Sequence, residues 1–271
     1  MNNWLSFHKY QGTGNDFILF DARESFPKEI ETSEVLAAWC HRHTGIGADG
    51  VIFLEATNQA DFSMRYFNAD GKEGSMCGNG SRCATAFAFD LGLIKETGHF
   101  VACDGIHECR IHDDQLFSVS IHDVNGVAVR PGGYFVDTGS PHWVKFVPSL
   151  EGFPVFEEGR KLRSNPIFGQ GGTNVNFVAD TDQGLQMATF ERGVEAETMA
   201  CGTGAVAVAM AYYVKMGWAV NHFGISLLVK GGELQVTFRP FHQANGISFS
   251  DVWLTGPACR VFSGQVPFPN S

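Results

Sequence analysis

The sequence predicts an α/β (α+β) protein in which one unit of sheet and helix occurs twice. Short runs rich in β-branched and aromatic residues are separated by glycine clusters, and they outnumber the segments of helical length. A block of Glu, Cys and Gly-x-Gly, followed by an apolar segment, lies at 73–80 and again at 197–204. Such an internal repeat indicates two copies of one unit, and 271 residues suffice for two modest domains.

The expected strands are the β-branched and aromatic runs at 17–20, 51–54, 62–67, 117–121, 143–147, 176–178, 226–229, 234–238 and 252–254. Segments long enough to form helices lie at 33–43, 82–93 and 205–216, and the first of them opens with Thr32 or Ser33 as an N-cap. The other two are apolar on nearly all sides, which is typical of helices enclosed by sheet.

Glycine and proline concentrate at 125–133, and we expect the boundary between the two copies there. The first domain is therefore expected over 1–125 and the second over 126–257.

Composition limits the partners and the location. Apolar residues form 44% of the chain and charged residues 18%, which supplies a buried core. Because the net charge is −10 and Lys and Arg do not cluster, we expect neither nucleic acid nor an anionic membrane surface as a partner. The longest apolar run, at 205–214, is too short to cross a bilayer. The N-terminus lacks signal-peptide character, so the expected location is the cytoplasm.

Two of the seven cysteines stand out, because Cys77 and Cys201 each precede a Gly-x-Gly that opens a helix. The end of a helix carries about half a positive charge, which favours thiolate over thiol. Glycines let a carboxylate approach the free N–H groups. Two such thiols facing one ligand suit removal of a proton from one face of a carbon and delivery to the other. This chemistry is racemisation or epimerisation, and it requires no cofactor.

The remaining cysteines are interpreted as core residues or free thiols: Cys40, Cys83, Cys103, Cys109 and Cys259.

Several blocks in this order resemble the diaminopimelate epimerase family: KYQGTGNDF (9–17), GIGADG (45–50), FNADGKEGSMCGNGSRC (67–83), GSPH (139–142), TNVNF (173–177) and FERGVEAETMACGTGA (190–205). Asn79 favours this family over the related proline racemases and hydroxyproline epimerases, which typically carry His there. The resemblance implies two pseudo-symmetric domains, each a mostly antiparallel sheet around a central helix, with the active site in the interdomain cleft. It also implies that the last strand, about 258–271, returns to the first domain.

The implied reaction is cofactor-independent interconversion of LL- and meso-diaminopimelate, a step toward lysine and, in many bacteria, peptidoglycan. By resemblance, Cys77 and Cys201 are the catalytic bases, and the carboxylate at the reacting centre is held by Gly78, Asn79, Gly202 and Thr203. The residues that hold the substrate elsewhere are Asn15, Asn68, Asn174 and Arg192, the last three at its distal end. Glu191 and His142 are supporting groups close to the thiols.

Two positions depart from the family pattern. Gly50 stands where certain relatives have Gln, and Ser140 stands where many have Asn. The longer amide is lost at 140, and we expect the Ser140 hydroxyl or a water molecule to replace its substrate contact. The reaction class is not expected to change.

Other interpretations remain open at this point. GIGADG fits a dinucleotide fingerprint, but a strand rather than a helix follows it. Structural zinc would use Cys40, His41 and His43, or Cys103, His107, Cys109 and His112, although neither set has a C-x2-C spacing. A binding protein without catalysis, and a racemase of another amino acid or of a symmetric diamino diacid such as lanthionine, are further alternatives. The expectation is no metal and no cofactor. The oligomeric state is undecided, with a homodimer as the assembly considered.

Overall fold

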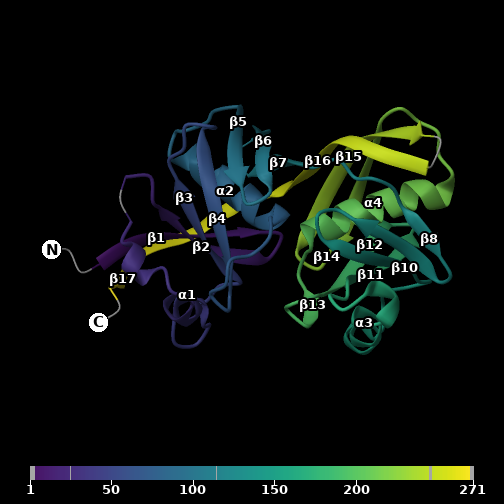
Figure 1. The fold of residues 1–271 in the computed structure, drawn as a ribbon, viewed down its shortest axis with the longest axis horizontal. Helices are drawn as coiled ribbons and strands as arrows, with labels where there is room; N and C mark the ends of the chain where they lie inside the picture. Colours follow the sequence, from purple (N-terminus) through teal and green to yellow (C-terminus); the bar gives the residue numbers. More distant parts are fainter. Residues whose placement is uncertain (1–3, 25, 114, 244–245, 269–271) are drawn as a thin grey trace. The chain divides into compact units, whose positions relative to one another are not determined.

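A computed structural model describes residues 4–24, 26–113, 115–243 and 246–268. The described chain divides into two compact units. One unit contains the residues up to Val119 together with the segment that begins at Pro257, and the other contains Ser120–Gly256. Each unit is described by itself below, and Figure 1 labels its elements.

The first unit contains two longer helices and a run of paired strands. Its elements in chain order are β1 (Trp4–Gly12), β2 (Asn15–Asp21), the 3-10 turn η1 (Lys28–Ile30), α1 (Ser33–Cys40), β3 (Gly50–Glu55), β4 (Phe62–Asn68), α2 (Gly78–Asp90), β5 (Thr97–Ala102), β6 (Gly105–Ile111), β7 (Leu116–Ile121) and the C-terminal β17 (Cys259–Pro267). β17 pairs antiparallel with β1, from Trp4 opposite Pro267 to Gln11 opposite Cys259. The first and last described strands therefore belong to one sheet.

The second unit has the same kinds of element. They are β8 (Ala128–Arg130), β9 (Gly133–Asp137), β10 (Pro141–Phe146), α3 (Val155–Arg163), the 3-10 turn η2 (Pro166–Phe168), β11 (Asn174–Thr181), β12 (Gly184–Glu191), β13 (Ala196–Thr198), α4 (Gly202–Met216), β14 (Phe223–Val229), β15 (Gly232–Gln243) and β16 (Gly246–Pro257).

Strand pairing repeats between the units. In the first unit, successive pairs from β1/β2 to β6/β7 are antiparallel, parallel, antiparallel, parallel, antiparallel and antiparallel. In the second unit, the pairs β9/β10, β10/β11, β11/β12, β12/β14, β14/β15 and β15/β16 follow the same order. The short β13 is an addition at the edge of β12. The internal repeat expected from the two cysteine blocks is confirmed, as is the mixed, mostly antiparallel fold class.

One helix of each unit is enclosed by strands. α2 contacts β1, β2, β3, β4, β6 and β17, and α4 contacts β9, β10, β11, β14 and β15. Figure 1 shows each helix among the strands of its own unit. Nearly every residue of these helices up to Ala88 and Tyr213 is buried, as expected for helices that are apolar on all sides. α1 and α3 instead cover separate apolar clusters around Phe20 and Phe177.

The helix boundaries differ from the sequence expectation. α1 begins at Ser33 with the Thr32 hydroxyl accepting from the Val35 N–H, but it ends at Cys40 rather than at 43. Its end is fixed by the N–H groups of Ile46 and Gly47, which both bond to the Trp39 carbonyl. α2 and α4 begin at Gly78 and Gly202 rather than at 82 and 205.

The expected strands are found at all nine positions, with longer bounds. The amphipathic helix α3 was missed, because a glycine at its centre lowers helix propensity. A Cβ on Gly159 would meet the Phe190 ring at 2.5 Å, so this helix lies too close to β12 for any side chain there. Its charges are a signal that was available, since Glu157 and Glu158 lie in the first turn and Arg160 and Lys161 in the last.

Within the part of the chain that the structure describes, no helix is both long enough and apolar enough to cross a membrane.

Candidate functional site

Cys77 is the N-cap of α2. Its backbone is extended, with φ −114° and ψ 110°, and its sulfur accepts from the Gly80 N–H at 3.4 Å. The side chain is half-buried. An N–H group and the positive end of a helix both favour a thiolate over a thiol. Cys77 therefore has the environment of a reactive cysteine.

Two amides lie beside this helix end with a fixed orientation. The Asn79 Nδ2 donates to Asn15 Oδ1 at 3.1 Å, and the Asn15 Nδ2 donates to Asp49 Oδ2 at 2.6 Å. At the other end of this series of hydrogen bonds, the Arg82 guanidinium donates to Asn79 Oδ1 at 3.0 Å. A carboxylate only accepts and a guanidinium only donates, so both amides are held one way round. These bonds hold the two amides in a preorganised frame.

The frame is anchored by ion pairs near the surface. Arg42 bonds to Asp49 Oδ1 at 2.6 Å and to Asp16 Oδ1 at 2.7 Å. Lys9, which is buried, pairs with Asp16 at 2.7 Å and also donates to the Gly47 carbonyl. Burial alone would raise the pKa of Asp16, but hydrogen bonds from Arg42 and Lys9 outweigh burial and lower it to about 2. The Asp16 carboxylate, which holds Lys9 and Arg42 in place, is therefore ionised throughout the ordinary pH range.

Asn68 and Gly50 are opposite each other in the β3/β4 ladder. The Tyr66 hydroxyl donates to Asn68 Oδ1 at 2.9 Å. A Cβ on Gly50 would meet the Phe67 carbonyl oxygen at 2.4 Å and Tyr66 Cε2 at 2.6 Å, and one on Gly74 would meet Tyr66 Cε1 at 2.5 Å. The Tyr66 ring therefore lies between two glycines and fills the space that a side chain at position 50 would need. Gly50 contributes room for this ring.

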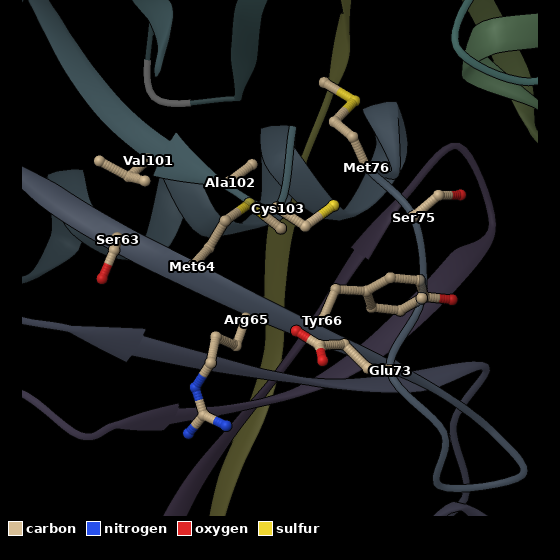
Figure 2. A pocket seen from close by; sticks show the side chains of 11 residues that line it. Ser63, Met64, Arg65, Tyr66, Glu73, Ser75, Met76, Val101, Ala102 and Cys103 are labelled. Carbon is tan, nitrogen blue, oxygen red and sulfur yellow. The ribbon is translucent and has the colours of Figure 1, made fainter. Parts of the chain in front are cut away.

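A pocket of about 230 Å³ opens beside the loop that leads to Cys77 (Figure 2). Its walls come from β4, from the loop at 73–76 and from the end of β5, with Met64, Met76 and Cys103 among its lining residues. Tyr66 also lines it, so the pocket borders Asn68 without containing it. None of the site residues expected from the sequence lines this pocket.

Cys201 holds the equivalent position in the second unit. It is the N-cap of α4, with φ −126° and ψ 109°, and it is buried. Its sulfur lies 3.8 Å from the Thr203 hydroxyl. Thr203 in turn lies 3.0 Å from His142 Nε2. The second thiol therefore has a hydroxyl and an imidazole aligned behind it.

The tautomer of His142 follows from Asn176. The Asn176 Nδ2 donates to the Trp143 carbonyl at 3.2 Å, which identifies that atom as the amide nitrogen. Its other hydrogen faces His142 Nδ1 at 3.2 Å, so Nδ1 accepts and Nε2 carries the proton. His142 Nε2 donates to Thr203, and the Thr203 hydroxyl is left to donate to the Cys201 sulfur. Asn176 is itself fixed by the Thr189 hydroxyl at 2.9 Å.

His142 is fully buried and stays neutral. Burial lowers its pKa to about 3, and the charge of Arg192 adds to this. A neutral imidazole orients the hydroxyl of Thr203 without bringing a charge next to the thiol.

Asn174 and Ser140 contact each other. The Asn174 Nδ2 donates to the Ser140 hydroxyl and to the Pro141 carbonyl, both at 3.1 Å, and its Oδ1 accepts from the Arg192 backbone N–H at 2.9 Å. Asn174 is 4% exposed. In this structure, it positions Ser140 and Arg192 with all of its donors in use.

Arg192 and Glu191 are adjacent and half-buried at the end of β12. Among the described residues, no carboxylate forms an ion pair with the Arg192 guanidinium. A guanidinium without such a partner is suited to bind a ligand carboxylate through two parallel hydrogen bonds.

Each of the two sets of residues considered for zinc combines buried and exposed side chains. Cys40 lies in the core around Phe20, and burial raises its pKa to about 12, whereas His41 and His43 are exposed. Burial likewise raises the pKa of Cys109 to about 12, while Cys103 is exposed. Metal binding requires a thiolate, and buried thiols of this kind are typical of core cysteines.

The geometry also identifies residues that the sequence analysis did not single out: Asp49, Tyr66, Arg82, Asn176 and Thr189. The sequence could have indicated Arg82 and Asn176, because each is a polar residue inside an otherwise apolar helix or strand.

Comparison with known proteins agrees with the repeat. The family model for diaminopimelate epimerase matches residues 7–124 and again 134–251. The chain belongs to the diaminopimelate epimerase family. A diaminopimelate epimerase of Flavobacterium psychrophilum is 44% identical over 264 residues, which cover 97% of this chain and all of that protein. One from Hydrogenobaculum sp. is 39% identical, with coverage of 96% and 98%.

Solved structures show the same fold at low identity. A phenazine biosynthesis protein of the PhzF family from Bacillus anthracis superposes with a TM-score of 0.74 at 15% identity, covering 97% of this chain and 99% of that one. A hydroxyproline epimerase from Agrobacterium vitis, solved with trans-4-hydroxy-L-proline, gives 0.69 at 15% identity, with coverage of 99% and 94%. As a member of the diaminopimelate epimerase family, this chain is an isomerase.

Proposed function

We propose that this chain interconverts LL- and meso-diaminopimelate without a cofactor. Protons are transferred between the α-carbon of the substrate and two cysteines of the protein. The observation that supports this most strongly is the matched position of Cys77 and Cys201 as N-caps of equivalent buried helices in two repeated units. A core cysteine has no reason to recur at both places with a Gly-x-Gly after it. The proposed function places the enzyme in lysine and peptidoglycan precursor synthesis.

In the proposed step, one cysteine is a thiolate and the other is a thiol. The thiolate takes the α-proton, so a C–H bond breaks and an S–H bond forms. The electron pair left on carbon delocalises into the α-carboxylate, where backbone N–H groups at the helix ends stabilise the charge. The opposite thiol then gives its proton to the other face of the carbon. The two sulfurs have exchanged protonation states, and the reverse reaction starts from the exchanged form.

Residues of both units are proposed to hold the substrate. Gly78, Asn79, Gly202 and Thr203 supply donors to the carboxylate at the reacting carbon, and Asn15 contacts the same end. The distal end of the substrate is assigned to Asn68, Asn174 and Arg192. The absence of an ion-pair partner for Arg192 among the described residues supports a role in carboxylate binding.

His142 and Glu191 are proposed as supporting groups. The line from His142 through Thr203 to Cys201 supports this role for His142, since a hydroxyl that donates to sulfur favours the thiolate. Ser140 contributes through Asn174, and Gly50 through the space it leaves for Tyr66. The cytoplasmic location and a homodimer stay predictions.

A substrate panel tests the proposal. Chelator-treated protein is incubated with LL-diaminopimelate, meso-diaminopimelate, meso-lanthionine, L-proline and trans-4-hydroxy-L-proline, and the isomers are separated by chiral chromatography. We expect isomerisation of diaminopimelate, and its loss in both Cys77→Ala and Cys201→Ala.

Other outcomes identify other functions. Turnover of a different amino acid would reassign the substrate, and activity that returns only with added zinc would reject the cofactor-free mechanism. Binding without isomerisation in the unmodified protein would indicate a binding protein.

A further inference from the structure

Arg82 is a fully buried arginine in the first turns of α2. Its Nη2 donates to the Thr13 hydroxyl at 2.9 Å and to Asn79 Oδ1 at 3.0 Å, and its Nη1 donates to the Gly78 carbonyl at 3.3 Å. Its Nε has no hydrogen-bond partner among the described residues. The guanidinium is therefore bound only to neutral oxygens, directly behind the helix end that Cys77 caps.

This location is unfavourable for a cation in two ways. A buried charge ordinarily needs a paired counter-charge, and no carboxylate pairs with Arg82 among the described residues. The side chain also lies near the positive end of a helix, where a positive charge destabilises. Burial lowers the pKa of Arg82 to about 10, and the groups that oppose this are Cys83 and Cys77. Such an arrangement is explained if an anion forms next to it during function.

The nearby titratable groups decide which anion this is. Burial raises the pKa of Cys83, and the charges of Cys259 on β17 and Asp16 on β2 add to this rise. Cys83 therefore stays a thiol. Asp16 is already paired with Lys9 and Arg42. Cys77, by contrast, is half-buried and accepts from a backbone N–H. The positive charge is therefore available to Cys77.

The turn that contacts Arg82 is strained. Thr13 and Gly14 form the two-residue turn between β1 and β2, with φ of +52° and +81°. Asn and Gly are favoured at such positions, whereas a β-branched residue with positive φ is a genuine outlier. Here the threonine hydroxyl accepts from Arg82. Backbone strain retained at this point fits a site in which the guanidinium must be held in place.

We propose that Arg82 is a positioning residue of the Cys77 half of the site: it fixes the Asn79 amide and, as a buried cation, favours the thiolate of Cys77. The first role rests on the proposed function, because Asn79 is assigned to the substrate carboxylate. The second role concerns the free protein and does not depend on which substrate is bound.

Site-resolved alkylation tests the charge without any substrate. Purified protein is treated with iodoacetamide between pH 5 and pH 10, and modification of Cys77 and Cys201 is followed by mass spectrometry. We expect Arg82→Met and Arg82→Gln to raise the pH midpoint for Cys77 by about one unit, a tenfold change in proton affinity. Cys201 is the internal control and keeps its midpoint. Arg82→Lys supplies an ammonium whose pKa burial also lowers, so its Cys77 midpoint should lie between those of Arg82→Gln and the unmodified protein.

Kinetics separate the positioning role. Arg82→Lys cannot reproduce the guanidinium fork, so we expect KM for diaminopimelate to rise about tenfold. Arg23→Met is the matched control, since this arginine of the same unit pairs with Asp21 at the surface. It should leave the midpoint and KM unaltered.

The comparison of Gln with Lys remains decisive if Arg82→Met does not fold. Equal Cys77 midpoints in Arg82→Gln, Arg82→Lys and the unmodified protein would overturn the charge role. An unchanged KM in Arg82→Lys would overturn the positioning role. If the unmodified protein isomerises no amino acid, the proposed function fails, whereas the alkylation result still stands by itself.

Discussion

Two equivalent glycines in the repeated blocks should respond differently to one added methyl group. Gly80 and Gly204 each lie three residues after a capping cysteine. A Cβ on Gly80 would meet Ile52 Cδ1, the flexible end of a side chain, at 3.2 Å. A Cβ on Gly204 would meet Asn176 Oδ1 at 2.5 Å, which is not tolerated without displacement of that amide.

The contacts give the magnitude. Alanine in place of glycine within a helix contributes about 1 kcal/mol of stability. In Gly204→Ala, the shift of Asn176 breaks its 2.9 Å bond from Thr189 and its 3.2 Å bond to His142. Each buried polar group left unsatisfied costs about 1 to 3 kcal/mol. We therefore expect a net loss of about 1 to 5 kcal/mol for Gly204→Ala and a change near zero for Gly80→Ala.

The assay should read each unit separately, because a chain with two units need not unfold in one step. Hydrogen exchange measured by mass spectrometry on peptides of α2 and α4 reports local opening in both variants. Faster exchange of α4 in Gly204→Ala, with α2 in Gly80→Ala unchanged, is the expected result. Equal effects of the two substitutions would refute the position assigned to Asn176 at the start of α4.

Three further changes have defined outcomes. Arg192→Met should raise KM for diaminopimelate about tenfold or more, because a lost hydrogen bond to a charged group costs about 1.5 kcal/mol or more; an unchanged KM would remove Arg192 from the site. His142 has a folded pKa of about 3, below its ordinary value of 6.5, so the unfolded state binds the proton first and stability falls as pH drops from 6.5 toward 3, by at most about 1.4 kcal/mol per pH unit. Urea denaturation at several pH values should show a shallower decline in His142→Asn, and parallel declines would contradict the assignment. Tyr66→Phe, which removes the bond to Asn68 and keeps the ring, should raise KM a few-fold with kcat retained, and a loss of kcat instead would place Tyr66 in the chemistry.

The repeat, nine of the strands and the two capping cysteines could be predicted from patterns in the sequence. Other strands, among them β1, β5, β6 and β12, lie outside the expected runs. β-branched runs form strands at most places where they occur between turn residues. The starts of α2 and α4 were placed a few residues late, since Gly78 and Gly202 have low helix propensity. These glycines begin helices because the cysteine before each one supplies the extended N-cap backbone.

The supporting contacts could not be predicted, because they join residues far apart in the chain. Asn79 meets Asn15 across 64 positions, and Asn176 meets His142 across 34. Their hydrogen-bond directions depend on strand register, which no local pattern specifies. Gly50 illustrates the same limit, since its role becomes evident only when the Tyr66 ring is seen to occupy the space beside it.

Isotope incorporation tests most directly whether both sulfurs serve one carbon. LL-diaminopimelate is converted in deuterium oxide, and product and residual substrate are analysed by mass spectrometry and chiral separation at early times. A proton taken by one cysteine and a deuteron delivered by the other predict one deuterium in the meso product and almost none in the remaining LL isomer. Deuterium that accumulates equally in recovered LL isomer, or isomerisation that survives in Cys77→Ala or Cys201→Ala, would contradict the account.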